Sequence, residues 1–222
     1  MERVPEPELM LNAAQARAYA EADFEAPHSR FMALLAEHLP SLPRRGVALD
    51  LGCGPGDITL RFARAFPGWR VDGVDASTAM LDLAGVAAAC AGLVERVAFH
   101  RWYLPDDAAP RDTYDLAFSN SLLHHLADPA ALWSWLRAHL ASGTPFSAMD
   151  LLRPDSPAGA RRLVDQYAAG EPEVLRTDFY NSLRAAYRPD EVRLQLTAAS
   201  LDALQIAVVS DRHFIVWGTL PA

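Results

Sequence analysis

The chain alternates short apolar runs with longer segments in which apolar residues recur every three or four positions. Runs bounded by polar and turn-forming residues predict strands at 47–51, 71–74, 97–99, 114–119 and 146–151. Helical spacing between these runs predicts helices at 57–66, 77–91 and 129–140. Ser77 has the chemistry of an N-cap for the second of them. Strands that alternate with helices of this length predict parallel βαβ units.

The pattern changes on both sides of this region. Residues 9–39, which include Leu9, carry helical spacing that predicts two helices broken at Pro27. Residues 153–188 predict irregular helices without a strand. The closing segment predicts a helix at 190–201 and an antiparallel hairpin of 206–210 and 214–220. We therefore expect an α/β fold, a Rossmann-like three-layer αβα sandwich with a mostly parallel seven-stranded sheet and an antiparallel last strand.

Composition and charge narrow the possible functions. The chain has no lysine, so all twenty basic residues are arginine, which excludes Schiff-base chemistry and the phosphate-binding lysine of a P-loop. The formal net charge of −8 argues against a nucleic-acid partner. The two cysteines fit a reduced cytoplasm and form no metal-ligand spacing, so we expect no metal site. No secretory leader or membrane span is evident. The richness in Arg and Ala is typical of a GC-rich bacterial genome.

Three glycines stand at alternate positions directly after the first predicted strand, in the stretch VALDLGCGPGD. At this turn glycine permits positive φ and lets a ligand approach the backbone, so Gly52, Gly54 and Gly56 predict a cofactor loop. A tight turn needed only for packing is the alternative. The spacing is not the G-x-G-x-x-G of dinucleotide-binding proteins, because Asp57 stands where the third glycine belongs. A carboxylate there would oppose a pyrophosphate, which disfavours NAD and FAD.

Asp75 ends the second predicted strand, in the stretch VDGVDAS. An acidic residue at this place accepts hydrogen bonds from ribose hydroxyls in nucleotide-binding α/β folds. The glycine loop and this carboxylate together predict a site for a nucleoside-bearing cofactor.

DLGCGPGD, GVDAS and the later stretch YDLAFSNSLLHHLADP together resemble the class I S-adenosylmethionine-dependent methyltransferases. The resemblance covers roughly residues 47–150, and the closing helix and hairpin fit the family's last strands. It implies one methyltransferase domain over 1–222, divided into a helical cap, a cofactor-binding core, a helical substrate-cap insertion and a closing helix and hairpin at 1–45, 46–152, 153–188 and 189–222.

The resemblance also implies a cofactor, S-adenosylmethionine, with S-adenosylhomocysteine as product, and a set of residues to hold it. Asp50 and the glycine loop, with the backbone of Cys53, would hold the methionine part, and Asp75 the ribose. The adenine would lie near Ala76, Met80, Arg101 and Trp102, and the methyl group near Asn120. The family usually has an acidic residue for the adenine amine after the third strand, and His100–Tyr103 contains none. Tyr19 would close over the cofactor as a lid or serve packing.

Candidates for the chemistry follow the fourth and fifth strands. His124 and His125 are candidate bases, because histidine titrates near neutrality, although a paired histidine here also serves packing or cofactor contact. Asp150 is a candidate base, a substrate anchor or a structural carboxylate. Arginine forks suit anionic groups and aromatic rings suit cations, so Arg153, Tyr180, Asn181 and Arg184 are candidates for acceptor recognition, with Tyr180 near the chemistry. A helical cap with aromatic core residues and solvated arginines is the alternative.

We therefore expect methyl transfer to a small-molecule acceptor in the cytoplasm, without nucleic acid or membrane partners. Two other functions remain open: an enzyme on the same fold that uses the cofactor or a derivative without methylating, and a non-catalytic binding or regulatory subunit. The sequence leaves the acceptor atom, the substrate and the oligomeric state open, a homodimer included.

Overall fold

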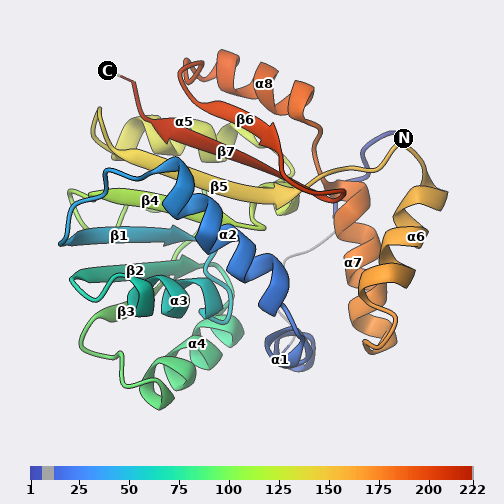
Figure 1. Ribbon diagram of the computed structural model, residues 1–222, viewed down its shortest axis with the longest axis horizontal. Coiled ribbons are helices and arrows are strands. Elements are labelled where there is room, and N and C mark those ends of the chain that lie inside the picture. Colours follow the sequence, from blue (N-terminus) through green and yellow to red (C-terminus); the bar gives the residue numbers. More distant parts are fainter. Residues whose placement is uncertain (7–12, 222) are drawn as a thin grey trace.

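The computed structural model describes residues 1–6 and 13–221 and contains a seven-stranded sheet covered by helices on both faces (Figure 1). The order across the sheet is β3-β2-β1-β4-β5-β7-β6. The first five strands pair in parallel, and β7 is antiparallel to both β5 and β6. The strands are β1 (Gly46–Leu51), β2 (Trp69–Asp75), β3 (Val97–Arg101), β4 (Leu116–Asn120), β5 (Pro145–Leu151), β6 (Gln205–Val208) and β7 (His213–Thr219). The expected sheet and closing hairpin are confirmed.

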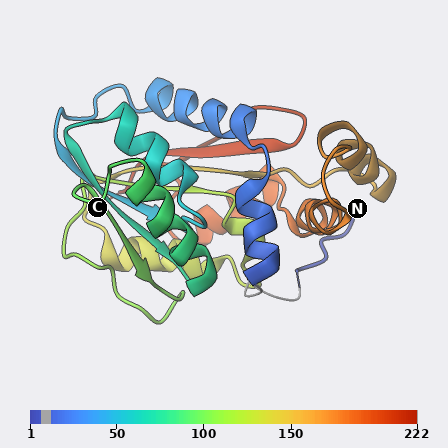
Figure 2. The same cartoon turned by 90° about the horizontal axis from the view of Figure 1, so that it is seen from below.

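Helices cover both faces of the sheet and form the two outer layers (Figure 2). Those that pack with one face of the sheet are α2 (Glu25–His38), α3 (Asp57–Ala65) and α4 (Thr78–Cys90). Those on the other face are α5 (Ala130–His139) and α8 (Pro189–Ala198). In the part of the chain that the structure describes, no helix combines the length and the apolar character needed to cross a membrane.

Side-chain alternation along β1 shows how the two cores form. Leu49 and Leu51 are fully buried on the side of α5 and α8, whereas Ala48 packs on the side of α2 and α3. Successive side chains of a strand point to opposite faces, so a strand that is buried on both faces reads as one continuous apolar run. By the same alternation Asp50 shares the face of Ala48, where it meets Thr59 of α3. β1 thus places the buried carboxylate of Asp50 at its carboxyl end, beside an otherwise apolar core layer.

Three further helices lie beyond the carboxyl ends of the parallel strands (Figure 1). They are α1 (Ala13–Glu21), α6 (Pro157–Tyr167) and α7 (Glu173–Ala185). Helices α6 and α7 make up the segment predicted as irregular helices, and they share a small core that includes Ala160, Val164 and Leu183. A single-turn 3-10 helix, η1 (Leu123–His125), follows β4.

The predicted helix break at Pro27 is wrong. The break lies at residues 22–24, and α2 begins at Glu25, so that Pro27 stands in its first turn. Proline is tolerated there because the N–H groups of a first turn have no partner within the helix. The carboxylate of Asp23 accepts the Glu25 N–H at 2.9 Å and supplies the start signal instead. Leu9, counted in the first predicted helix, lies outside the described residues.

Candidate functional site

A pocket of about 780 Å³ lies at the carboxyl ends of β1, β2 and β4. The loops after these strands form its floor, and α1 together with the start of α2 forms one wall. Ligands of open α/β sheets bind at this edge, where the strand order reverses. Here the reversal falls between β1 and β4, since the chain moves outward from β1 to β3 and then crosses back. The pocket therefore occupies the place at which this architecture binds ligands, and its size suits a cofactor together with a small acceptor.

The glycine loop leaves bare backbone at the floor of the pocket. Gly54 has φ of +52°, and a Cβ at this position would have no atom within 4 Å. The empty space beside it is thus available to a ligand that approaches the main chain. Gly52 differs, because a Cβ there would lie 2.9 Å from the Leu122 side chain. Gly52 accordingly permits close packing, whereas Gly54 leaves the main chain open toward the pocket.

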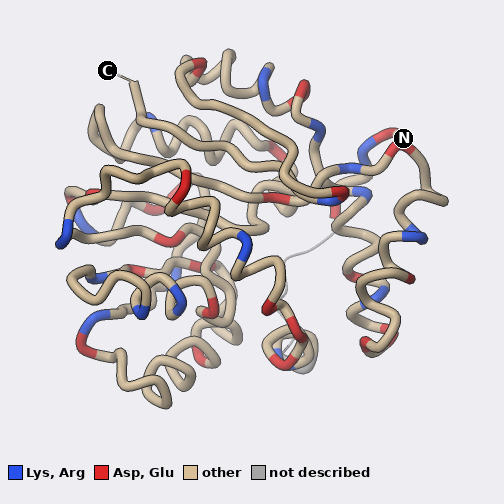
Figure 3. The backbone as a smooth tube through the Cα atoms, in the orientation of Figure 1, with Lys and Arg blue, Asp and Glu red and all other residues tan. Residues whose placement is uncertain are grey.

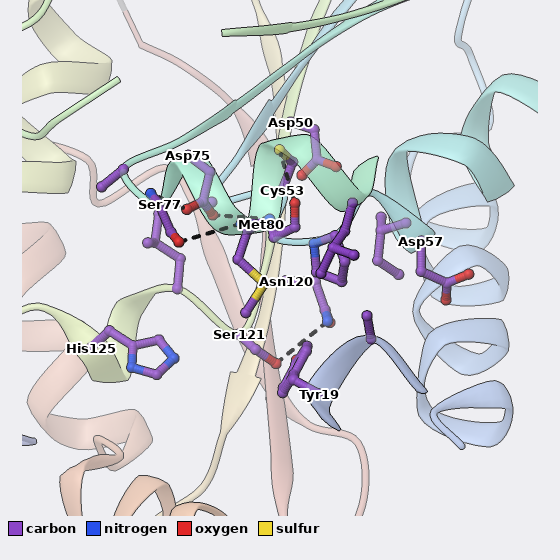
Figure 4. Close-up of a pocket in the computed structure, with 18 of the residues that line it drawn as sticks. Tyr19, Asp50, Cys53, Asp57, Asp75, Ser77, Met80, Asn120, Ser121 and His125 are labelled. Carbon is purple, nitrogen blue, oxygen red and sulfur yellow. Dashed lines mark hydrogen bonds between the residues drawn. The ribbon is translucent and has the colours of Figure 1, made fainter. Parts of the chain in front are cut away.

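Asp75 links the glycine loop to the end of β2. One carboxylate oxygen accepts the Gly54 N–H at 2.9 Å, and the other accepts the Ser77 N–H at 2.8 Å (Figure 4). Burial raises the pKa of this carboxyl, although the backbone hydrogen bonds work against the shift. Ser77 in turn caps α4 by accepting the Met80 N–H, as predicted. Each carboxylate oxygen keeps acceptor capacity for a ligand hydroxyl.

Asp50 lies deeper, at the end of β1, and is 1 % exposed. It accepts the Thr59 hydroxyl at 2.5 Å. Burial raises the pKa of Asp50 to about 7; the Thr59 hydrogen bond lowers it and the charge of Asp75 raises it further. This carboxyl therefore changes charge near neutral pH, and a cationic ligand group would favour its ionised form.

The end of β4 presents an unpaired polar atom to the same pocket. Asn120 donates its side-chain N–H to the Ser121 hydroxyl at 3.4 Å, while its Oδ1 is buried and finds no partner among the described residues. Ser121 has φ of +61°, a left-handed conformation that costs a non-glycine residue free energy. Buried acceptors are normally satisfied. Within the described part of the chain, Oδ1 of Asn120 is therefore an unsatisfied acceptor at the edge of the pocket.

His125 faces the pocket from η1, and the structure gives it a partner that the sequence analysis did not identify. Its Nδ1 lies 2.6 Å from Oε2 of Glu6. Burial would raise the pKa of Glu6, but the hydrogen bond and charge of His125, the charge of His124 and the hydroxyl of Ser182 bring it down to about 2. Because this carboxylate is ionised, Nδ1 must donate, which leaves Nε2 of a neutral His125 as an acceptor. Figure 4 shows the ring extending from its loop toward the pocket.

Glu6 reaches His125 because the N-terminal segment 1–6 is fixed across α7 and η1. The guanidinium of Arg3 donates to the carbonyl oxygens of Ala185, His124 and Leu126. It also lies over the ring of Tyr187, with 4.0 Å to the ring centroid. The Val4 N–H donates to the Arg184 carbonyl at 3.0 Å. These contacts connect positions more than a hundred residues apart, which no local pattern could reveal.

His124 and Asp150 form a buried pair outside the pocket lining. Asp150 Oδ1 lies 2.6 Å from His124 Nδ1, and the carboxylate also accepts the N–H groups of Leu123 and Leu151, each at 2.7 Å. Burial would lower the pKa of His124, but the charge and hydrogen bond of Asp150 raise it. Of the three roles considered for Asp150, this geometry favours the structural carboxylate, which holds η1 against β5.

Glu6, His124 and His125 also place possible metal-ligand atoms within 4.8 Å of one another. Both Nδ1 atoms are already bound to carboxylates. We therefore interpret the group as hydrogen-bonded pairs, and the absence of a metal site stays a prediction.

Several predicted residues line the pocket and others lie elsewhere. The predicted residues that line it are Tyr19, Asp50, Gly52, Cys53, Gly54, Asp75, Ala76, Met80, Trp102, Asn120 and His125. Tyr19 contributes from α1, where its ring packs 4.7 Å from that of Phe24. Burial, and then the charges of nearby carboxylates, raise its pKa to about 12, so it remains a hydroxyl donor. Gly56 begins α3 as a left-handed N-cap rather than lining the pocket.

The structure does not bring the predicted acceptor residues to this pocket. Arg153, just after β5, is buried, and its guanidinium donates to the Ala186 carbonyl and to Glu191. It therefore connects the end of β5 to the start of α8. The guanidinium groups of Arg161 and Arg184 each lie 5.5 Å from the ring centroid of Tyr180. Asn181 and the exposed Arg101 are likewise absent from the lining.

Beside Glu6, the sequence analysis did not select His28 and Arg61. The Nδ1 of His28 lies 2.6 Å from the carboxylate of Asp57, and Arg61 donates to the same carboxylate at 2.7 Å. Asp57 had been noticed only as the residue that replaces a glycine. Through its contact with His28, Asp57 connects α3 to α2 beside the pocket, while Arg61 pairs with it within α3.

Comparison with known proteins agrees with this geometry. A methyltransferase domain model matches residues 49–146. The chain belongs to the class I S-adenosylmethionine-dependent methyltransferases. Asp50, the Gly52–Gly56 loop and Asp75 all fall within the residues that the methyltransferase domain model matches.

Among curated relatives, a trans-aconitate 2-methyltransferase from Methylobacterium radiotolerans is 36% identical over 153 residues, which are 67% of this chain and 54% of that protein. A release factor glutamine methyltransferase from Gloeobacter violaceus is 39% identical over 104 residues, 46% of this chain and 34% of that protein. The chain thus spans at most about half the length of these relatives.

Solved structures extend the similarity to the whole fold. A methyltransferase from Aquifex aeolicus aligns with a TM-score of 0.67 at 18% identity and covers 93% of this chain and 98% of its own. The plantazolicin methyltransferase BpumL, solved with S-adenosylhomocysteine, aligns with a TM-score of 0.67 at 14% identity and covers 95% of both chains. At these identities the likeness shows the fold alone.

Proposed function

We propose that the chain binds S-adenosylmethionine and transfers its methyl group to a small-molecule acceptor. One observation carries the proposal: open backbone at Gly54, the carboxylate of Asp75 and the unpaired oxygen of Asn120 meet in one pocket at the edge where this fold binds ligands. A nucleoside-bearing cofactor needs close main-chain approach and a hydroxyl acceptor, and both are present.

The residues fit the cofactor in a consistent order along the pocket. Asp75 would accept the ribose hydroxyls, Met80 and Trp102 would line the base, and Asp50 would face the ammonium of the methionine part. When bound, the sulfonium supplies a methyl carbon that takes the acceptor's electron pair while the C–S bond breaks and sulfur keeps its electrons. The contribution of the protein is then alignment, which is worth up to ~7–11 kcal/mol in a well-oriented reaction.

Acceptors that lose a proton need a base, and His125 is placed for that role. Nε2 is the free nitrogen, because the Glu6 carboxylate fixes the proton on Nδ1. The acceptor proton would pass to Nε2, and the imidazolium so formed would be stabilised by Glu6. His124, paired with Asp150 outside the lining, would position the neighbouring backbone.

A small acceptor is supported by the enclosure of the pocket. Residues of α1 and the α1–α2 junction stand on one side, and Glu6 of the N-terminal segment closes another. Labelled S-adenosylmethionine incubated with the chain and with small metabolites, a protein lysate or RNA tests this directly. We expect label in the small-molecule fraction; label confined to protein or RNA contradicts it. Cofactor binding without any transfer would instead favour a non-methylating enzyme or a regulatory subunit.

The affinity for the cofactor should rise with pH through neutrality. With the pKa of Asp50 at about 7, its ionised fraction rises from about a tenth at pH 6 to about nine-tenths at pH 8. Only the ionised form attracts the ammonium group, and this α-amino group, with a pKa of ~7.7–8.0, is about half deprotonated at pH 8, so Kd should fall about fivefold over this range. Calorimetry at both pH values measures it. Asp50→Asn keeps the Thr59 contact and should flatten the dependence; an equal slope in both proteins would contradict the role of Asp50.

Replacing the proposed base should slow transfer without weakening cofactor binding. His125→Gln is expected to lower kcat about 10²-fold, the lower end of the usual range for general acid–base catalysis, because no group remains to take the acceptor proton. Steady-state kinetics with the acceptor found above, and calorimetry with the cofactor, give the two readouts. His139→Gln on α5, outside the pocket, is the matched control. A kcat within about twofold of the parent would exclude His125 as the base.

A further inference from the structure

The charge of the pocket points to the kind of acceptor, on the assumption that the proposed methyl transfer is correct. Beyond Asp50 and Asp75, which face the cofactor, five more carboxylates line the pocket: Glu6, Asp23, Glu25, Asp57 and Asp128. Among the described lining residues, Arg61 is the one guanidinium. In Figure 3 acidic positions gather where α1 meets α2, and Asp23 and Glu25 of this junction line the pocket. A site with this balance repels anions and attracts cations.

Arg61 is not free to hold an anion. Its Nε donates to Asp57 at 2.7 Å, one terminal nitrogen donates to Glu25 at 2.7 Å, and the other donates to the Ser29 hydroxyl at 3.1 Å. Each of the three nitrogens therefore already donates one N–H to the protein, and two carboxylates face this single guanidinium charge. A carboxylate ligand that reached the remaining N–H groups of Arg61 would be repelled by Asp57 and Glu25, which already compensate its charge.

The histidines of the pocket are matched in the same way. His28 is bound through Nδ1 to Asp57, and His125 is bound through Nδ1 to Glu6. Even when protonated, each would first neutralise its own carboxylate. Neither supplies an uncompensated positive charge to a ligand.

The undescribed residues 7–12 cannot reverse this balance. Their sequence is Pro-Glu-Leu-Met-Leu-Asn, which contains no arginine or histidine, and the whole chain contains no lysine. Polycarboxylates are held in proteins chiefly by arginine forks. The pocket offers none that is unoccupied.

We propose that the acceptor is a neutral or cationic molecule, such as an alcohol, phenol or amine, whose reacting atom loses a proton to His125. The acceptor is then not a polycarboxylate such as trans-aconitate, after which several of the relatives are named. Two independent features agree: the one guanidinium among the described lining residues is already paired with two carboxylates, and the pocket presents a carboxylate-oriented imidazole. A carboxylate nucleophile is already deprotonated and would have no use for that imidazole. In the reaction the acceptor atom forms the new bond to carbon, sulfur takes the electron pair of the C–S bond, and the acceptor proton goes to Nε2.

The test separates acceptors by charge before the reaction. A bacterial metabolite extract is divided by ion exchange at neutral pH into cationic, neutral and anionic pools, and each pool is incubated with the full chain and methyl-labelled S-adenosylmethionine. We expect label in the cationic or neutral pool. Preferential labelling of the anionic pool overturns the proposal, whichever compound carries the label.

Calorimetry with trans-aconitate gives a second readout on the same protein loaded with S-adenosylhomocysteine. We expect no binding at concentrations up to about 1 mM; a Kd below that value overturns the proposal. Titration of the unloaded chain with S-adenosylmethionine keeps the two ideas separate. Absence of cofactor binding, or cofactor binding with no label in any pool, overturns the proposed methyl transfer itself and the acceptor class with it.

Discussion

Asp75→Ala is expected to weaken the binding of S-adenosylmethionine by about 10²–10⁴-fold. The carboxylate would accept two ribose hydroxyls, and hydrogen bonds to a charged group are worth ~1.5–3 kcal/mol each, so their loss removes ~3–6 kcal/mol. The same substitution frees the Gly54 and Ser77 N–H groups that Asp75 now holds, which loosens the cofactor loop. Calorimetry of the variant against the parent chain gives the change in Kd.

Asp82→Ala is the matched control for this experiment. Asp82 is exposed on α4 and does not line the pocket, so the substitution removes one negative charge nearby without touching the ligand. Its affinity for the cationic cofactor should stay near that of the parent. Equal losses in both variants would mean that Asp75 acts through net charge, and unchanged affinity in Asp75→Ala would remove the basis of the nucleoside assignment.

Gly54→Ala is expected to lower cofactor affinity at least about 10²-fold while the chain stays folded. A Cβ at Gly54 meets no protein atom within 4 Å, so it would occupy the space that we assign to the ligand. The left-handed backbone adds ~1–2 kcal/mol of strain to the alanine variant, which a thermal melt would register as a lower Tm.

Gly92→Ala separates strain from obstruction. Gly92 follows α4 with φ of +67°, has open space where its Cβ would lie, and does not line the pocket. The two variants should therefore lose similar stability, and only Gly54→Ala should lose affinity. If both bind the cofactor as the parent does, the main chain at Gly54 is not the surface on which the ligand rests.

Much of the fold and the local geometry of the glycine loop could be predicted because the signals are local. An apolar strand, a glycine turn and a capping serine each involve neighbouring residues, and β1, Gly54 and Ser77 behave as expected. The misplaced helix break shows the limit of local rules. Pro27 breaks a helix only in its interior, and the sequence pattern did not reveal that Asp23 starts a new one before it.

The acceptor side could not be predicted because it depends on partners far apart in the chain. Glu6 meets His125 across 119 positions, and Arg153, which suggested anion recognition, is bound to Glu191 at the start of α8. An arginine in the sequence predicts an anionic partner, but it does not indicate whether that partner belongs to a ligand or to the protein. The one available signal was a histidine beside the cofactor edge, which needs a carboxylate or carbonyl to fix its tautomer.

Calorimetric titration of the unmodified chain with S-adenosylmethionine, with NAD as the comparison ligand, tests the central claim most directly. The account predicts one cofactor bound per chain with a Kd in the micromolar range or tighter, and no binding of NAD, because Asp57 stands where a pyrophosphate would lie. Saturable binding of NAD, or no heat with S-adenosylmethionine, would contradict it.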